Sequence, residues 1–177
     1  MIVFKDGTGN FNTIVGAILA ALDQSVKPLF IKIEKDTYQE YIRNVKKKTN
    51  IFPIGEGMDS MIIMGNRSSI NGNKMYDTAT AGVFGNGFTA QDSTFRNNAG
   101  PVKHQAIIRC PFINVGSTGI KTLYMKKNIN STETEIYGTI DFICGDATAM
   151  FQNCLIEART PMARQYNTIT DSTKERA

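Results

Sequence analysis

The feature that most constrains the fold is a weak repeat of short apolar segments in the second half of the chain. The segments DSTFRNN, RCPFINV and NCLIEAR each place polar residues before an apolar residue and end in a short polar exit. Their comparable apolar positions, with one more from TEIYG, are Phe95, Phe112, Ile136 and Ile156, at steps of 17, 24 and 20 residues. Repeats of this length are typical of solenoids, in which each coil buries its apolar side against the next coil. The repeat therefore predicts an all-β solenoid.

A β-sandwich is the alternative arrangement of many short strands. It would need frequent hairpin turns, and Asn-Gly pairs occur only at 71–72 and 86–87. The composition, with 41% apolar and 20% charged residues among 177, is ordinary for one globular domain that buries a core. The hairpin signals thus favour the solenoid.

Residues 13–22, TIVGAILAAL, carry a helical pattern, with Thr13 as a plausible N-cap. The apolar residues expected on one face are Ile14, Ile18, Leu19 and Leu22. A helix placed here would cover the open N-terminal end of a solenoid. Short apolar runs then predict strands at 29–33, 51–54 and 61–64, the last two separated by a turn at 55–57.

Charge and cysteine content exclude several classes of function. The net charge of +4 comes from scattered Lys and Arg residues, which argues against a nucleic-acid partner. The three cysteines are too widely spaced for a zinc site, although one disulfide with one remaining thiol, or three thiols, both stay open. No segment is long and apolar enough to span a membrane, and no signal peptide precedes Lys5. We expect no metal, no cofactor and no membrane anchor.

Longer motifs resemble one family, the plant pectin methylesterases. KDGTGNFNTIVGAILAA resembles the opening of that family, and DTYQEYI is similar to its Gly-x-Tyr-x-Glu segment, with Asp36 where Gly is usual. Residues 46–68, 85–107 and 135–162 are similar to the family along their whole length. The resemblance implies a right-handed parallel β-helix with a short N-terminal capping helix. It also implies a monomer that is secreted to the cell wall and acts on methyl-esterified homogalacturonan.

The resemblance also implies the chemistry of the site. In the family, one carboxylate attacks the ester carbonyl, a second carboxyl group acts as acid and then base, and glutamine amides stabilise the oxyanion. Position by position, Asp141 in Asp-Phe-Ile-Cys-Gly matches the nucleophile, and Gln105 matches the first glutamine. Lys121 stands where the second carboxyl group is usual, and Ile120 where the second glutamine is usual.

These departures predict impaired turnover. Lysine cannot replace an aspartate as proton carrier unless its pKa is strongly lowered, and isoleucine donates no hydrogen bond. The family's Leu-Gly-Arg-Pro-Trp motif would fall after Ala177, so we expect residues 1–177 to be a partial catalytic domain without its C-terminal coils. Two alternatives to an active esterase remain: a catalytically inactive pectin-binding β-helix, and a fragment with no function of its own.

Overall fold

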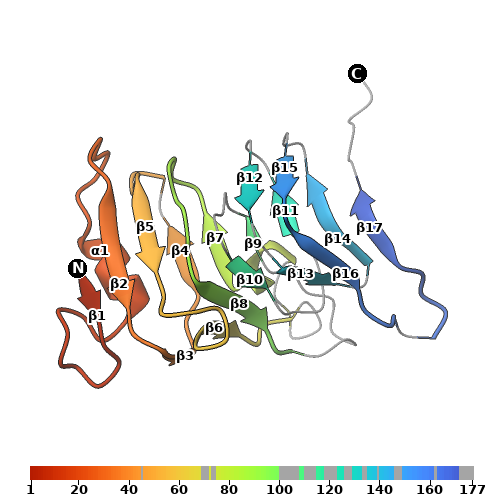
Figure 1. Ribbon diagram of the computed structural model, residues 1–177, viewed down its shortest axis with the longest axis horizontal. Coiled ribbons are helices and arrows are strands. Elements are labelled where there is room, and N and C mark those ends of the chain that lie inside the picture. The colour runs from red at the N-terminus through yellow and green to blue at the C-terminus, as the bar shows by residue number, and fades with distance from the viewer. Residues whose placement is uncertain are drawn as a thin grey trace.

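The computed structural model describes residues 1–44, 46–68, 72, 75–99, 108–109, 115–117, 123–125, 129–132, 135–138, 140–145, 149–161 and 163–171. In this part of the chain, strands succeed one another along the long axis of the molecule, with the N-terminus near one end and the C-terminal strands at the other (Figure 1). The helical elements described are α1 (Ile14–Ala20) and the 3-10 helix η1 (Met75–Thr78). The described part of the protein is therefore all-β, with one short α-helix and one 3-10 helix.

Two six-stranded sheets form most of the structure. Sheet I contains, in spatial order, β16 (Leu155–Ala158), β13 (Glu135–Gly138), β10 (Val115–Ser117), β8 (Ser93–Asn97), β6 (Met61–Gly65) and β3 (Asp36–Tyr38). Sheet II contains β17 (Thr168–Asp171), β14 (Ile140–Gly145), β11 (Leu123–Met125), β9 (Ile108–Arg109), β7 (Ala81–Val83) and β4 (Ile42–Asn44). Successive strands of the chain alternate between the two sheets, so each sheet grows in the order of the sequence.

Two smaller sheets complete the architecture. One contains β1 (Ile2–Val3), β2 (Leu29–Ile33) and β5 (Ile51–Ile54), and the other contains β12 (Ile129–Thr132) and β15 (Ala149–Gln152). All pairings between these named strands, and all those within sheets I and II, are parallel. Parallel neighbours cannot be joined by a tight hairpin. The hairpin-rich sandwich considered from the sequence is therefore wrong.

The register of the parallel strands places equivalent residues of successive strands on top of one another, in columns. In sheet I the register joins Tyr38, Ile63, Phe95, Ser117, Ile136 and Ile156. In sheet II it joins Ile42, Ala81, Ile108, Leu123, Ile143 and Thr170. The first three residues of the sheet I column are buried, whereas Ile156 is only partly buried and Thr170 is exposed. Apolar residues of neighbouring strands are therefore stacked and buried over part of each column, as at Ile42, Ala81 and Ile143 of sheet II.

The column corrects the predicted repeat at one position. Phe95, Ile136 and Ile156 do share a column, but Ser117 pairs with both Phe95 and Ile136 and so fills the position assigned to Phe112. The observed steps are 22, 19 and 20 residues. Phe112 itself lies outside the described residues. The apolar residues around Phe112 in the sequence produce a pattern similar to that of the repeat. Only the pairing of strands shows which residue occupies the column.

The strands predicted at 29–33 and 51–54 are confirmed as β2 and β5, and that at 61–64 is one residue longer as β6. The turn between β5 and β6 depends on its glycines. Gly57 has a φ of +130°, and a Cβ on Gly55 would lie 2.1 Å from the carbonyl oxygen of Asp92. Since only glycine has no Cβ, this approach of two backbones requires it.

Helix α1 packs against β1 and β4, and both of its ends are held by charged side chains. At its start, the Thr13 hydroxyl accepts a hydrogen bond from Gly16 N at 3.1 Å, which confirms the predicted N-cap. The Glu40 carboxylate accepts two more, from Ile14 N and Val15 N, both at 2.9 Å. These bonds satisfy amide groups that a helix leaves without intrahelical partners, and they place negative charge at the positive end of its dipole.

At the other end of α1, the Lys48 ammonium donates to the carbonyl oxygen of Ala21, the C-cap residue. The same ammonium lies 2.8 Å from the Asp23 carboxylate. This hydrogen bond from Lys48 lowers the pKa of Asp23 below its ordinary value. A cation at the negative end of the helix dipole is favourable. Glu40 and Lys48 therefore stabilise the two ends of α1, and we call this pair of contacts the clamp.

The helix is shorter than predicted, and its buried face differs. The buried side chains are Ile14, Ala17 and Ile18, whereas Leu19 is 53% exposed and Leu22 is 78% exposed. The expected burial of Leu19 and Leu22 is therefore wrong. Helical neighbours lie three and four residues apart, which favours Ala17 over Leu19 beside Ile14. Leu22 follows Ala21, whose extended backbone (ψ 147°) ends the helix.

We expect Glu40→Gln to lower the free energy of unfolding by about 1–3 kcal/mol, because the amide keeps one acceptor oxygen but aims a donor at the second backbone N–H. Urea denaturation followed by circular dichroism measures this change. Glu157→Gln is the matched control, because Glu157 is exposed on β16. Equal stability of the two variants would contradict the clamp.

Tyr38 gives a second prediction, for alkaline pH. Its phenol is buried and donates to the Glu34 carbonyl oxygen at 3.1 Å. Burial, with smaller contributions from Asp36 and other nearby carboxylates, raises its pKa to about 12. An unfolded tyrosine ionises near pH 10. The folded state therefore keeps its proton longer than the unfolded state, and stability falls as the pH rises from about 10 to about 12.

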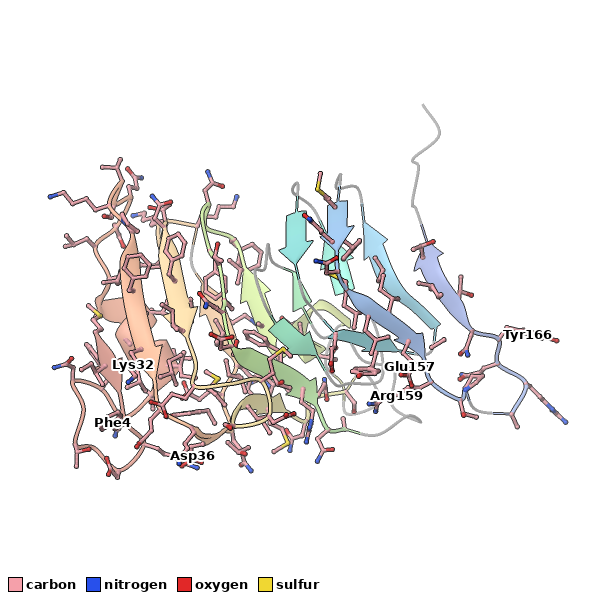
Figure 2. The ribbon with its side chains drawn as sticks, viewed as in Figure 1. Phe4, Lys32, Asp36, Glu157, Arg159 and Tyr166 are labelled. Atoms are coloured by element: carbon pink, nitrogen blue, oxygen red, sulfur yellow. The ribbon has the colours of Figure 1, made fainter. Side chains whose placement is uncertain are left out.

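The Tyr38→Phe variant should lack this component, which we expect to be about 1–2 kcal/mol. The measurement is the free energy of unfolding at several pH values between 9 and 12. Tyr166→Phe is the control, because Tyr166 is 86% exposed and protrudes near the C-terminal end (Figure 2). A parallel pH dependence in wild type and Tyr38→Phe would exclude this role of Tyr38.

Candidate functional site

Asp141 lies on β14, between β11 and β17 in sheet II. The pairing with β17 changes register along this strand: Ile140 pairs with Thr168, but Ile143 pairs with Thr170. Three steps along β14 thus match two along β17, so Asp141 and Phe142 fall within a β-bulge. Bulges bend a strand and redirect its side chains, and they are common beside active sites. The backbone of β14 is therefore irregular at the position predicted to carry the nucleophile.

The other predicted site residues cannot be compared with this geometry. Gln105, Ile120 and Lys121 lie outside the described residues, as does His104. In the sequence, Gln105 precedes β9 by three residues, and β9 belongs to the same sheet as β14. Lys121 precedes Leu123 by two residues, just as Asp141 precedes Ile143, the register partner of Leu123. The roles predicted for Asp141, Gln105 and Lys121 therefore stay predictions.

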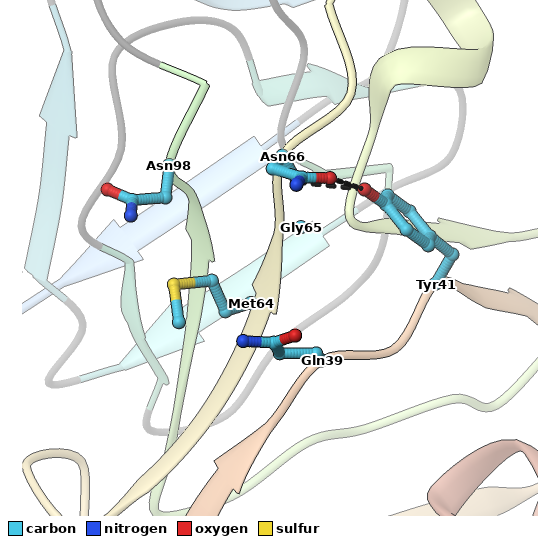
Figure 3. Close-up of a pocket in the computed structure, with 6 residues that line it drawn as sticks. All are labelled: Gln39, Tyr41, Met64, Gly65, Asn66 and Asn98. Atoms are coloured by element: carbon cyan, nitrogen blue, oxygen red, sulfur yellow. Dashed lines mark hydrogen bonds between the residues drawn. The ribbon is translucent and has the colours of Figure 1, made fainter.

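A hollow with a volume of about 200 Å³ opens at the corner where the chain passes from sheet I to sheet II. It is lined by Gln39, Tyr41, Met64, Gly65, Asn66 and Asn98, which follow β3, end β6 or follow β8 (Figure 3). Three of these side chains are primary amides and one is a phenol, and none is charged. Such groups both donate and accept hydrogen bonds.

One edge of the hollow is fixed by a paired contact. The Tyr41 hydroxyl donates to Asn66 Oδ1 at 2.7 Å and accepts from the Asn66 backbone N–H at 2.8 Å (Figure 3). The Arg67 guanidinium lies over the Tyr41 ring, 3.8 Å from its centroid, within the range of a cation–π interaction. Among the described residues, no carboxylate forms an ion pair with Arg67. The hollow thus has beside it an exposed cation that forms no ion pair with the described residues.

The backbone beneath the hollow is held by Asn97, which is buried in β8. Its Nδ2 donates to the carbonyl oxygens of Arg67 at 3.1 Å and Thr78 at 3.0 Å, and its Oδ1 accepts from Ala99 N at 3.0 Å. This buried amide ties the segments after β6, η1 and β8 together. It therefore fixes the position of residues 66–67 and of Asn98.

Sequence reasoning did not find this hollow. It assigned no role to Gln39, Asn66, Arg67 or Asn98. Gln39 and Asn98 are 59 positions apart in the sequence, and no motif links them. Strand stacking alone brings them together. By contrast, Asp36, the departure from the family's glycine, is accommodated in β3, where its carboxylate binds Lys5 at 2.8 Å.

Hydrogen bonding from Lys5 lowers the pKa of Asp36, so this surface ion pair persists at neutral pH.

Within the described ranges, no group of three or more His, Cys, Asp and Glu side chains is arranged to hold a metal ion. Among the same residues, no helix has the length and apolar character needed to cross a membrane. The Cys154 thiol donates to the Gln152 carbonyl oxygen at 3.3 Å.

The fold and the bulged strand define a class of protein: stacked parallel strands with an aspartate at an irregular position of one sheet. The family model described as Pectinesterase matches residues 1–177, and the chain belongs to the pectinesterase family. It is 42% identical, over 183 residues, to pectinesterase/pectinesterase inhibitor PPE8B of Prunus persica, covering 96% of this chain and 34% of that protein. The chain thus spans about a third of the length of this relative.

Solved structures agree with this assignment. The pectin methylesterase from carrot superposes with a TM-score of 0.87 at 31% identity, covering 98% of this chain and 57% of the carrot chain. A pectin methylesterase in complex with a hexasaccharide superposes with a TM-score of 0.79 at 25% identity, covering 97% of this chain and 60% of its own. The chain is therefore similar to these enzymes over most of its length, and to a little more than half of theirs.

Proposed function

We propose that this chain carries the nucleophile-bearing face of a pectin methylesterase, an enzyme that hydrolyses methyl esters of galacturonate residues in cell-wall homogalacturonan. The observation that carries the proposal is the position of Asp141. It falls in the β14 bulge of a chain that matches the pectinesterase family over residues 1–177. A similar enzyme has been solved in complex with a hexasaccharide, which supports an oligosaccharide as the ligand.

In the proposed reaction, the Asp141 carboxylate attacks the ester carbonyl carbon. The carbonyl π electrons move to its oxygen, where the Gln105 amide donates a hydrogen bond to the oxyanion. Collapse of this intermediate breaks the bond to the methoxy group, which takes up a proton and leaves as methanol. Water then hydrolyses the resulting anhydride, which returns the Asp141 carboxylate and leaves a galacturonate carboxylate on the polymer.

We also propose a right-handed parallel β-helix for the fold, with α1 as its N-terminal cap. The supporting observations are the alternation of successive strands between sheets I and II, the parallel pairing and the apolar columns. Residues 1–177 would form part of the catalytic domain of a monomeric enzyme that acts in the cell wall. The partial coverage of the relatives supports the first point, and the biology of the family is the basis for the others.

The identities of residues 120 and 121 favour slow turnover. Methanol departure requires a proton donor, and Lys121 stands where the family has its acid/base carboxyl group. Loss of such a group costs roughly 10²–10⁴-fold in rate, and loss of an oxyanion donor such as the glutamine replaced by Ile120 costs roughly 10²–10³-fold. A chain that binds pectin with little hydrolysis is therefore the second candidate function.

We expect methanol release from methyl-esterified pectin to be at least about 10³-fold slower than for an intact relative, from these substitutions alone. The Asp141→Asn variant should abolish the residual release, whereas Asp59→Asn, at an exposed position, should leave it unchanged. A rate within tenfold of the relative would refute the impairment. Residual release that survives in Asp141→Asn would refute Asp141 as the nucleophile.

The double variant Ile120→Gln/Lys121→Asp tests the cause of the impairment. We expect it to raise methanol release by about 10²-fold or more, because it restores a proton carrier and an oxyanion donor. Lys126→Asp is the control for the change of charge. If the wild type and the double variant both release no methanol above the uncatalysed rate, the proposed esterase function is wrong.

A further inference from the structure

The hollow at the corner of sheets I and II has the chemistry of a sugar-binding site. Its volume of about 200 Å³ is below the ~300–1,000 Å³ of pockets that enclose a drug-sized ligand. It therefore suits one sugar ring rather than an oligosaccharide. Among the described residues, the side chains of Gln39 and Asn98 make no hydrogen bond, so their amides remain available to ligand hydroxyl groups.

Arg67 adds selectivity for an acidic sugar. Stacking on the Tyr41 ring at 3.8 Å orients its guanidinium, and within the described part of the chain no residue accepts a hydrogen bond from it, so its in-plane N–H groups can donate to a ligand. A carboxylate can accept two of these bonds at once, whereas a methyl ester carries no negative charge. None of the described lining residues is acidic, so none of them competes for the guanidinium.

We infer that this hollow, together with Arg67, binds one carboxylate-bearing sugar residue of a polysaccharide at a site separate from Asp141. Three strands of sheet II, β7, β9 and β11, lie between β4, which follows Tyr41, and β14, which carries Asp141. At ~4.8 Å per strand, Tyr41 lies about 20 Å from β14 along the sheet, and Arg67, which lies between β6 and β7, about 14 Å, so only an oligosaccharide or polymer reaches both. The identity of that polymer, partly de-esterified homogalacturonan, rests on the proposed function.

In this arrangement, the free carboxylates produced by hydrolysis are the groups that Arg67 recognises. A chain that already carries free galacturonate would therefore be retained, while its esterified residues lie elsewhere on the protein. The hollow thus distinguishes de-esterified from esterified residues independently of the chemistry at Asp141.

The matched control is a second arginine–tyrosine stack. Arg159 lies over the Tyr137 ring at 4.8 Å, but the Tyr137 hydroxyl donates to Glu135 Oε2 at 2.9 Å, and Glu157 and Arg159 lie near one another on β16 and after it (Figure 2). The two arginines share the stacking and the exposure. Among the described residues, the Tyr41 hydroxyl is paired with Asn66 at the amide-lined hollow, whereas the Tyr137 hydroxyl is paired with the Glu135 carboxylate.

The test is isothermal titration calorimetry of the whole chain with a fully de-esterified galacturonate hexamer, which requires no catalysis. We expect Arg67→Met to weaken binding by about tenfold or more, as for loss of a charge-assisted hydrogen bond, and Arg159→Met to change it less than twofold. Gln39→Ala/Asn98→Ala should weaken it several-fold without altering net charge. Circular dichroism and thermal unfolding verify that each variant is folded.

Two further comparisons separate specific from general attraction. A fully methyl-esterified hexamer should bind more weakly, with no difference between wild type and Arg67→Met. Equal losses in Arg67→Met and Arg159→Met, or no binding of the acidic hexamer at millimolar concentration, would overturn the inference. Because the hexamer contains no ester, such a failure leaves the methanol-release result unaffected, and a failure of methanol release leaves this titration unaffected.

Discussion

The contact on which the N-terminal half depends is the one between the Glu40 carboxylate and the first amides of α1. A seven-residue helix is too short to be stable alone in water, because nucleation costs more than a few intrahelical bonds return. Glu40 and Lys48 supply opposite charges at its two ends, and both come from the segment around β4. The residues that flank the first strand of sheet II thus bind both ends of the helix that packs against that strand and β1.

Beyond the N-terminal end, the register of the strands determines which residues of successive strands stack on one another. Parallel pairing stacks residues into columns that are mostly apolar, and buried members occur as far along as Ile136 and Ile143, whereas Ile156 is only partly buried and Thr170 is exposed. A strict register gives every strand the same geometry, which is useful for packing but gives no distinctive site. The bulge in β14 and the corner hollow are departures from that regularity. Both arise where the chain cannot repeat the preceding coil.

How well each feature could be predicted depends on how far apart in the sequence the residues that determine it lie. Local signals identified Thr13 as an N-cap and the strands at 29–33 and 51–54, because capping and β-propensity act within a few residues. The expected burial of Leu19 was wrong because the helix turns Ala17 rather than Leu19 toward the side of Ile14, and the assignment of Phe112 to the column was wrong because strand pairing places Ser117 there. Asp141 could be predicted only through a long motif resembling a family. Gln39, Arg67 and Asn98 could not, because nothing local marks residues that only stacking brings together.

Recognition and hydrolysis make different demands on such a molecule. The proposed hydrolysis needs several groups from neighbouring strands to meet at one ester, so we expect the residues at 120 and 121 to weaken it. Recognition of an acidic polymer needs only an oriented cation and hydrogen-bonding groups, which the buried Asn97 and the Tyr41–Asn66 pair provide at one corner. These contacts use no group from the 120–141 region. A chain of this family can therefore lose most of its turnover and still keep a surface that distinguishes a free carboxylate from its ester.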